Sequence, residues 1–173
     1  MNTGWLVRKV MIAVLAFAII AVVAAAAGAE WIAIAGHSGH IQDKTVTNYY
    51  AGESFEYGWG LDIVQKPGTS NWVHFAVPGP AFSTKGVRYI NLYFLTGSAD
   101  AWVSDVDVYN GYTKVKSFTG TWADGWQNVT LDLGWIRPFS KGLGISVKIN
   151  AGVESMNHRF VFATAKANFV DRP

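Results

Sequence analysis

Aromatic side chains are the residues of this sequence best suited to bind a ligand. Seven of the eight tryptophans and all seven tyrosines lie after residue 29. An aromatic ring matches the apolar face of a sugar ring, while nearby amides and carboxylates orient the sugar hydroxyls. The alternative is that these rings fill the core and corners of a sheet protein. The candidate ligand-binding residues are Tyr89, Asn91, Tyr93, Tyr109, Tyr112, Trp102, Trp122 and Trp126.

These candidates fall into two groups. Tyr89, Asn91 and Tyr93 alternate with three apolar residues, so they should share the outer face of a strand whose other face is buried. Tyr109 and Tyr112 flank a predicted turn and should be exposed beside it. The three tryptophans could complete a rim around either group.

A catalytic alternative rests on the segment Gly36-His37-Ser38-Gly39-His40, which combines residue types of a serine hydrolase. The nucleophile elbow of such enzymes needs a glycine two residues after the serine, and His40 stands there instead. A glycine turn after the first strand is the simpler interpretation. A hydrolase that uses His37, Ser38 or His40 would need a carboxylate brought to them by the fold.

Metal and cofactor chemistry has little support in the sequence. His37 and His40 are three residues apart, but a zinc site would need a further ligand from elsewhere. His74 lies in an apolar segment, where a hydrogen-bonded structural histidine is the simpler interpretation. The absence of cysteine excludes disulfides, cysteine-zinc sites and thiol catalysis. Since Gly142-Leu143-Gly144 also lacks the Lys-Ser/Thr of a phosphate loop, we predict no metal, no cofactor and no catalytic residue.

Two carboxylates sit beside a predicted hairpin. Asn110-Gly111 favours a two-residue type I′ turn, because both residue types tolerate positive φ. The resulting register would put Lys114 opposite Asp107 and Lys116 opposite Asp105. A lysine opposite each carboxylate would neutralise the charge that a cation requires. We therefore interpret the two aspartates as members of solvated ion pairs rather than as a calcium or acid–base site.

The elements that must position these residues are strands. Short segments of period-two alternation, such as Ile145, Val147 and Ile149, recur between glycine, proline and asparagine turns. Beyond residue 29 no segment sustains the 3.6-residue apolar period of a helix. The pattern predicts an all-β fold, a single antiparallel β-sandwich of about eight or nine strands, formed by residues 30–173.

The first 29 residues have the build of a secretory signal helix. Arg8 and Lys9 precede an uncharged apolar run of 18 residues, and Ala27-Gly28-Ala29 offers the small residues of a cleavage site. An uncleaved membrane anchor is the alternative, because 18 residues is the lower edge of a membrane span. Either way the body is expected to be secreted or otherwise extracytoplasmic.

Cleavage after residue 29 would also change the net charge of the protein. It removes two of the 14 basic residues and none of the 12 acidic ones, so 12 basic and 12 acidic residues remain (12 − 12 = 0). A neutral body implies no nucleic-acid partner. Contact with a membrane is expected only if the leader stays attached.

One segment carries a resemblance. From Gly58-Trp59-Gly60 through Lys66-Pro67-Gly68-Thr69-Ser70-Asn71-Trp72-Val73-His74-Phe75-Ala76-Val77-Pro78, the sequence is similar to a family of small uncharacterised exported proteins. Trp135 and the Gly142–Val147 stretch are similar to the same family. The resemblance extends loosely over most of residues 30–169 and is specific mainly in Lys-Pro-Gly-Thr-x-Asn-Trp. It implies a jelly-roll-like sandwich with no assigned activity, so no catalytic residue follows from it.

These observations favour an exported, non-catalytic binding or surface-interaction module, with a glycan or another cell-surface component as its partner. Carbohydrate is the leading ligand class. The alternative is a structural exoprotein that self-associates through sheet edges or an aromatic patch. A hydrolase that uses His37, Ser38 or His40 is the third hypothesis.

Overall fold

The computed structural model describes residues 29–48, 55–80 and 84–173, so the predicted signal helix lies outside the described residues. The described chain forms eleven strands and two single-turn 3₁₀ helices. The strands are β1 (Glu30–Ala35), β2 (His40–Ile41), β3 (Phe55–Tyr57), β4 (Gly60–Val64), β5 (Ser70–Val77), β6 (Lys85–Thr96), β7 (Ala101–Asn110), β8 (Thr113–Ala123), β9 (Gly125–Arg137), β10 (Leu143–Ala151) and β11 (Arg159–Asp171), and the 3₁₀ helices are η1 (Gly36–Ser38) and η2 (Lys44–Val46).

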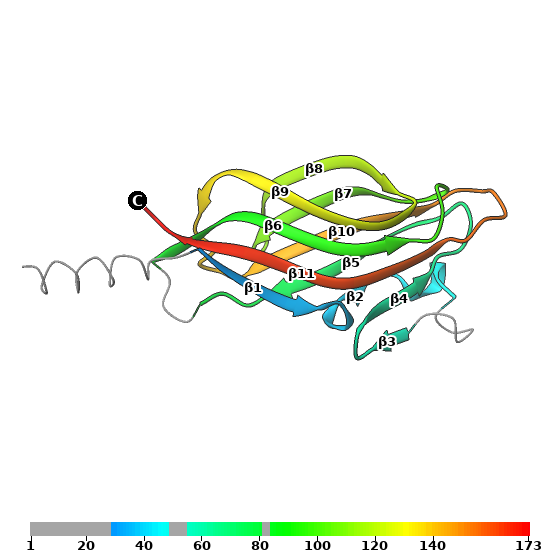
Figure 1. The fold of residues 1–173 in the computed structure, drawn as a ribbon, viewed down its shortest axis with the longest axis horizontal. Coiled ribbons are helices and arrows are strands. Elements are labelled where there is room, and N and C mark those ends of the chain that lie inside the picture. The colour runs from blue at the N-terminus through cyan, green and yellow to red at the C-terminus, as the bar shows by residue number, and fades with distance from the viewer. Residues whose placement is uncertain (1–28, 49–54, 81–83) are drawn as a thin grey trace, which may run out of the picture.

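The strands build two antiparallel sheets packed face to face (Figure 1). The first sheet has the order β3-β4-β11-β6-β9, with β1 also paired to β11, and the second has the order β2-β5-β10-β7-β8. From β4 onward the chain crosses between the sheets at every connection except the β7–β8 hairpin. This connectivity is that of an eight-stranded jelly roll. The predicted antiparallel sandwich is thus confirmed, and β1 to β3 are added to the eight strands of the roll.

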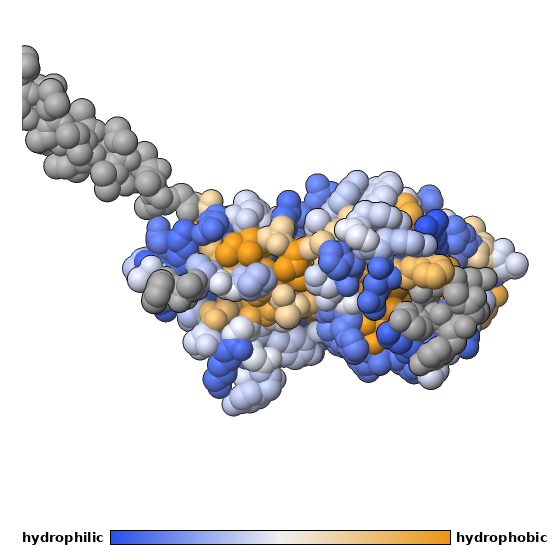
Figure 2. Space-filling model, turned by 90° about the horizontal axis from the view of Figure 1, so that it is seen from below, coloured by the Kyte–Doolittle hydropathy of each residue, from blue (hydrophilic) through white to orange (hydrophobic). Residues whose placement is uncertain are grey.

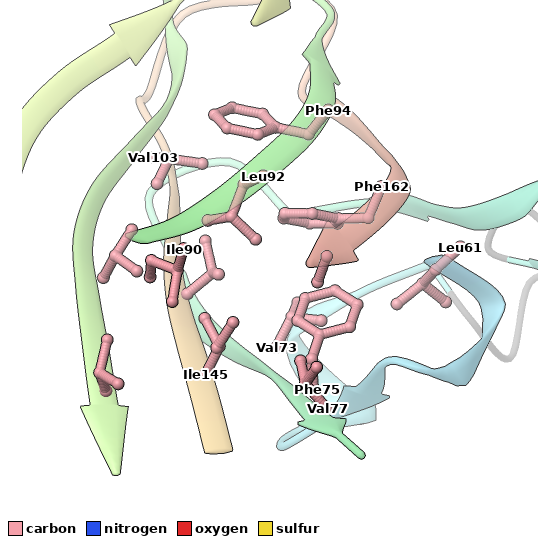
Figure 3. Close-up of a cluster of buried hydrophobic side chains, with 14 of the residues drawn as sticks. Leu61, Val73, Phe75, Val77, Ile90, Leu92, Phe94, Val103, Ile145 and Phe162 are labelled. Carbon is pink, nitrogen blue, oxygen red and sulfur yellow. The ribbon is translucent and has the colours of Figure 1, made fainter. Parts of the chain in front are cut away.

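Alternate residues of both sheets point inward and form one core (Figure 3). Ile90, Leu92 and Phe94 on β6 are fully buried, as their period-two spacing predicts. The ring of Phe162 lies 5.5 Å from that of Phe75 in the other sheet and 5.6 Å from that of Phe94. The core therefore joins the two sheets.

The Lys-Pro-Gly-Thr-x-Asn-Trp segment forms the turn before β5 and the start of that strand. Gly68 adopts a φ of 71°, which glycine tolerates without strain. Thr69 donates its hydroxyl to the Lys66 carbonyl at 2.6 Å, which closes the turn. The Asn71 side chain donates to the carbonyl of Asp43 at 2.6 Å and accepts from its N–H at 3.1 Å. These contacts give the segment a structural role.

The β7–β8 hairpin has a different register from the predicted one. Asn110 pairs with Thr113, so the two-residue loop is Gly111-Tyr112 rather than Asn110-Gly111. Asn110 stays in the strand, where its side-chain oxygen accepts the N–H of Lys141 at 2.9 Å. Glycine with a φ of 59° at the first loop position suits a type II′ turn. The shift places Tyr112 at the tip of the turn.

The predicted ion pairs change with this register. Lys114 still reaches Asp107 at 3.1 Å, although Ser117 stands directly opposite that aspartate. The pairing of Asp105 with Lys116 is wrong, because Asp105 lies 4.0 Å from Lys148 of β10. The shifted turn moves every cross-strand partner by two residues, and a bulge next to Val108 moves the later partners by one more.

Along one long side of the sandwich, β1 of the first sheet runs near β5 of the second. Apolar surface is visible there between polar margins (Figure 2). Ile32 and Ile34 of β1 are only partly buried and pack against the core at this side. Across residues 29–48, 55–80 and 84–173, no helix has the length and hydrophobicity of a membrane span.

Candidate functional site

The structure divides the candidate aromatic residues between the two sheets. Tyr89, Asn91 and Tyr93 share the outer face of the first sheet, and Trp126 of the neighbouring strand lies beside them. Tyr109 belongs to the second sheet, where the β7–β8 turn begins. No single surface therefore unites all eight residues.

On the first sheet the main feature is the Tyr93–Trp126 pair. The two ring centroids are 4.7 Å apart and the ring planes differ by 23°, so each ring covers a face of the other. Beneath them Asn91 is 3% exposed and donates its amide to Asn128 and Thr130, both at 2.8 Å. The polar groups here bind each other, as in a cross-strand ladder that stabilises a sheet.

On the second sheet the strand ends form a groove. Two adjoining hollows, of about 360 and about 470 Å³, share Gly111 and Gly144 among their lining residues. Gly144 lies on β10 between Ala76 of β5 and Tyr109 of β7, so the sheet has a gap in its side chains at that point. We call this the Gly144 groove; its lining residues are Ala76, Val77, Pro78, Tyr109, Gly111, Tyr112, Lys141, Gly142, Leu143, Gly144, Ile145, Ser146, His74 and Phe75.

Polar groups at one end of the Gly144 groove are held in a fixed arrangement. His74 lies directly opposite Ser146, and its Nδ1 is 2.8 Å from the serine hydroxyl oxygen. Its Nε2 is 3.2 Å from Oε1 of Gln42, which can only accept, so Nε2 carries the proton and Nδ1 accepts from the Ser146 hydroxyl. The serine oxygen keeps lone pairs that can accept a hydrogen bond from a ligand hydroxyl.

The imidazole of this pair favours its neutral form. Burial lowers the pKa of His74 below its usual value, and the nearby His40 lowers it further. His40 faces His74 across the β2–β5 pairing. The interpretation of His74 as a hydrogen-bonded structural residue agrees with these contacts, and the same side chain also lines the groove.

Tyr109 is fixed beside a neutralised carboxylate. Asp107 is 5% exposed and accepts hydrogen bonds from Ser117, from Lys114 at 3.1 Å and from the Tyr109 hydroxyl at 3.4 Å. Burial raises the pKa of Tyr109, and the charge of Asp107 raises it further. The hydrogen bond to Asp107 raises the pKa of Lys114. With its oxygens occupied by protein donors, Asp107 supports the wall of the groove.

Tyr112 is the most exposed aromatic residue of the groove, at 85%. The ammonium of Lys141 lies 4.6 Å from the centre of its ring, so the cation covers one ring face. The turn itself holds the backbone, because Gly111 donates its N–H to the Gly142 carbonyl at 3.0 Å. A tyrosine ring at the tip of a braced turn can stack on a ligand with little further ordering.

The other candidate residues lie outside both regions. Trp122 packs against the core, where its ring covers Gly120. Trp102 pairs with Asn150 and Ala123 near the opposite end of the second sheet from Tyr109. Of the three tryptophans predicted to complete a rim, Trp126 is the one that lies beside a candidate group, where it stacks on Tyr93.

Among the residues that the structure describes, His37 and Ser38 of the hydrolase hypothesis are not assembled with an acid. His37 and Ser38 are exposed in η1, and His40 is exposed at the start of β2. Within the described part of the chain, neither His37 nor Ser38 is hydrogen-bonded to a carboxylate. Among the same residues, no three histidine or acidic side chains lie close enough to hold a metal ion.

Sequence reasoning missed three parts of the groove, namely Gly144, Ser146 and Lys141. The period-two pattern of β10 does place Gly144 and Ser146 on the side opposite the core. Their importance depends on β10 lying between β5 and β7, and these strands are far apart in the sequence. The sequence around Lys141 gives no indication of a binding role, because this residue simply lies in a short loop, three residues after Pro138.

No protein-family model and no curated protein matches the sequence. Several solved structures resemble it. The xylan-binding module CBM86 from Roseburia intestinalis has a TM-score of 0.46 at 12% identity, over 81% of this chain and 96% of that one. The module CBM6cm-2 of Cellvibrio mixtus lichenase 5A, in complex with cellotriose, has a TM-score of 0.44 at 12% identity, over 79% and 95%. CBM36, in complex with calcium and xylotriose, has a TM-score of 0.43 at 14% identity, over 79% and 98%. The likeness concerns the fold, so the ligand has to be inferred from this chain's own residues.

Proposed function

We propose that this protein is an exported, non-catalytic carbohydrate-binding module whose glycan lies in the Gly144 groove. The observation that carries the proposal is the hollow that the rings of Tyr109 and Tyr112 line together with the polar pair His74–Ser146. The second hollow, which Lys141 lines, adjoins it at Gly111 and Gly144. Both hollows are shallow and open to solvent, so a sugar bound in them would stay partly exposed.

The groove offers the two kinds of contact that a sugar needs. The exposed ring of Tyr112 can stack on the apolar face of a pyranose. The Ser146 oxygen can accept from a hydroxyl group, and the Lys141 ammonium can donate to one. Gly144 leaves the floor open, so the sugar can approach the backbone of β10.

A pair of substitutions tests this assignment. Tyr112→Ala should weaken binding of a cognate oligosaccharide by about tenfold or more, because the stacked ring is lost. Its melting temperature should be almost unchanged, since the side chain is 85% exposed. The measurement is a screen of neutral oligosaccharides on a glycan array, followed by titration calorimetry of the ligand that binds.

Tyr93→Ala serves as the matched control on the other sheet. It removes a ring of the same type and should leave affinity unchanged. If Tyr93→Ala abolishes binding while Tyr112→Ala does not, the groove is the wrong site. If no glycan binds the intact protein and its mass in solution rises with concentration, the self-associating structural protein is the better explanation.

A further inference from the structure

A second exposed aromatic residue, Trp135, lies near the end of β9 and is displayed by an irregularity of that strand. Tyr89 pairs with Asp132 and Val87 pairs with Arg137, so four residues of β9 stand opposite one residue of β6. Bulges of this kind redirect side chains, and they often border binding sites.

Arg88 of β6 holds the irregular segment in place. Its guanidinium donates to the carbonyl of Gly134 at 2.6 Å and to the carboxylate of Asp132 at 2.7 Å. The other oxygen of Asp132 accepts the N–H of Gly134 at 2.8 Å. Gly134 has a φ of 90°, which disfavours any other residue type. The projection of Trp135 is therefore a built feature of the strand.

Trp135 is 62% exposed and carries a cation on one face of its ring. The guanidinium carbon of Arg137 lies 4.3 Å from the ring centre. Nε of Arg137 is buried and has no hydrogen-bond partner. Among the residues that the structure describes, no carboxylate is in ion-pair range of this guanidinium, whereas Arg88 and Arg159 each bind an aspartate.

The Trp135–Arg137 pair is joined to the Gly144 groove by a short loop. Arg137 ends β9, and Lys141 is only four residues further along, so their Cα atoms are at most about 14 Å apart. The side chain of Asn110 holds this loop, because it accepts from the N–H of Lys141 at 2.9 Å. Two pairs of an exposed aromatic ring and a cation thus flank residues 138–140 at one end of the sandwich.

We propose that this end of the molecule binds a glycan that carries carboxylate groups, a polyuronate, across the two aromatic–cation pairs. The proposal rests on the proposed function and specifies its ligand class. A guanidinium presents parallel N–H groups that match the two oxygens of a carboxylate. A uronate can stack on the aromatic ring while its carboxylate forms an ion pair with the neighbouring cation. A neutral sugar has no negative group to pair with that cation.

The nearby acidic residues do not compete for this role. Asp132 is bound to Arg88, and Glu30 lies 3.5 Å from Lys85. Residues 30–173 have no net charge, with 12 basic and 12 acidic residues, so a preference for an acidic glycan would come from these local cations.

The experiment compares two forms of one ligand, oligogalacturonate and its methyl ester at equal chain length. The two have the same sugar chain, and they differ in the methyl groups that cap the carboxylates and remove their charge. Titration of the full-length exported protein should show the acid form binding about tenfold or more tightly than the ester. Arg137→Gln should lower the affinity for the acid form far more than the affinity for the ester, and should thereby remove most of this difference. Arg137→Lys keeps the positive charge but lacks the planar donors of the guanidinium. This variant should retain only part of the preference for the acid form.

Lys66→Gln provides the charge-matched control. Lys66 lies at the opposite end of the sandwich, where its ammonium donates to the carbonyl of Thr45. Its loss should leave the preference for the acid form intact. A melting curve of each variant verifies that it is folded.

Three results would overturn the proposal. One is equal affinity of the wild-type protein for the acid and the ester. The protein would then be a carbohydrate-binding module without a preference for acidic glycans. The second is an unchanged preference in folded Arg137→Gln. The third is binding of dextran sulfate as tightly as oligogalacturonate, which would indicate general anion attraction. Failure of every glycan to bind, the neutral ones included, would instead refute the proposed function itself.

Discussion

Two aromatic regions on opposite sheets differ in what their rings face. Tyr93 and Trp126 stack on each other at 4.7 Å, and the amide of Asn91 below them binds Asn128 and Thr130. In the Gly144 groove, Tyr112 has a lysine on one face and stands at the rim of a hollow. Both regions contain exposed rings beside polar side chains, so their composition is nearly the same.

The difference shows that exposure alone does not make an aromatic residue a binding platform. The ring faces that Tyr93 and Trp126 turn toward each other are closed to a ligand, whereas the cation on the covered face of Tyr112 is itself a donor that a ligand can use. A polar group that is hydrogen-bonded within the sheet likewise offers little to a ligand. The groove has an aromatic ring, a serine acceptor and an open glycine floor at one place, because three strands end there together.

The largest expected effect comes from filling the groove. A Cβ added at Gly144 would meet its nearest atom, in Tyr109, at 3.5 Å, which is ordinary contact. Gly144→Leu should therefore fold normally but occupy the floor, and glycan binding should fall by about a hundredfold or more. Calorimetry and a melting curve measure the two effects. Gly58→Leu is the control, because a Cβ there meets no atom within 4 Å; equal loss of binding in both variants would contradict the assignment.

An intermediate effect, on stability, is expected from the other region. Trp126→Ala should lower the free energy of unfolding by about 1 kcal/mol, because it removes a cross-strand ring pair. The substitution should leave the affinity for the glycan unchanged. Urea denaturation and titration together measure this. A Trp126→Ala protein that is fully stable but no longer binds glycans would reverse the comparison between the two regions.

The smallest effect concerns pH. The pKa of His74 is lowered in the folded protein, so the unfolded chain takes up this proton at a higher pH than the folded one. The stability that neutral His74 contributes is present above the usual histidine pKa of about 6.5 and is lost as the pH falls below it. Stability between about pH 7.5 and about pH 5.5 should fall more for the wild-type protein than for His74→Gln, measured by urea denaturation. Parallel pH profiles would refute this.

Much of the fold is predictable from local pattern. The alternation of Ile90, Leu92 and Phe94 with polar residues determines which face of β6 is buried, because successive strand residues point to opposite sides. The same rule places Tyr89, Asn91 and Tyr93 outside. The register of the β7–β8 hairpin was not predictable, because Asn110 is held by Lys141 from a distant loop. That tertiary contact overrides the local preference of Asn-Gly for the turn.

The binding region could be predicted only in part for a similar reason. Tyr109 and Tyr112 are found from their position beside a turn. Nothing in the sequence shows that Gly144 lies between Ala76 and Tyr109, because the pairing of β10 with β5 and β7 joins segments more than 30 residues apart. Nor does it show that Trp126 stacks on Tyr93 and is thereby set apart from the groove.

The strand content, the inward and outward faces, the zero net charge of residues 30–173 and the lack of disulfide chemistry all follow from composition and from the two-residue period of a strand. Other properties follow only from how the strands are arranged: which exposed rings face a hollow, which cations of the described residues lack a carboxylate, and which strands meet at the Gly144 groove. Those properties depend on strand order and on bulges, which arise from contacts between residues far apart in the chain.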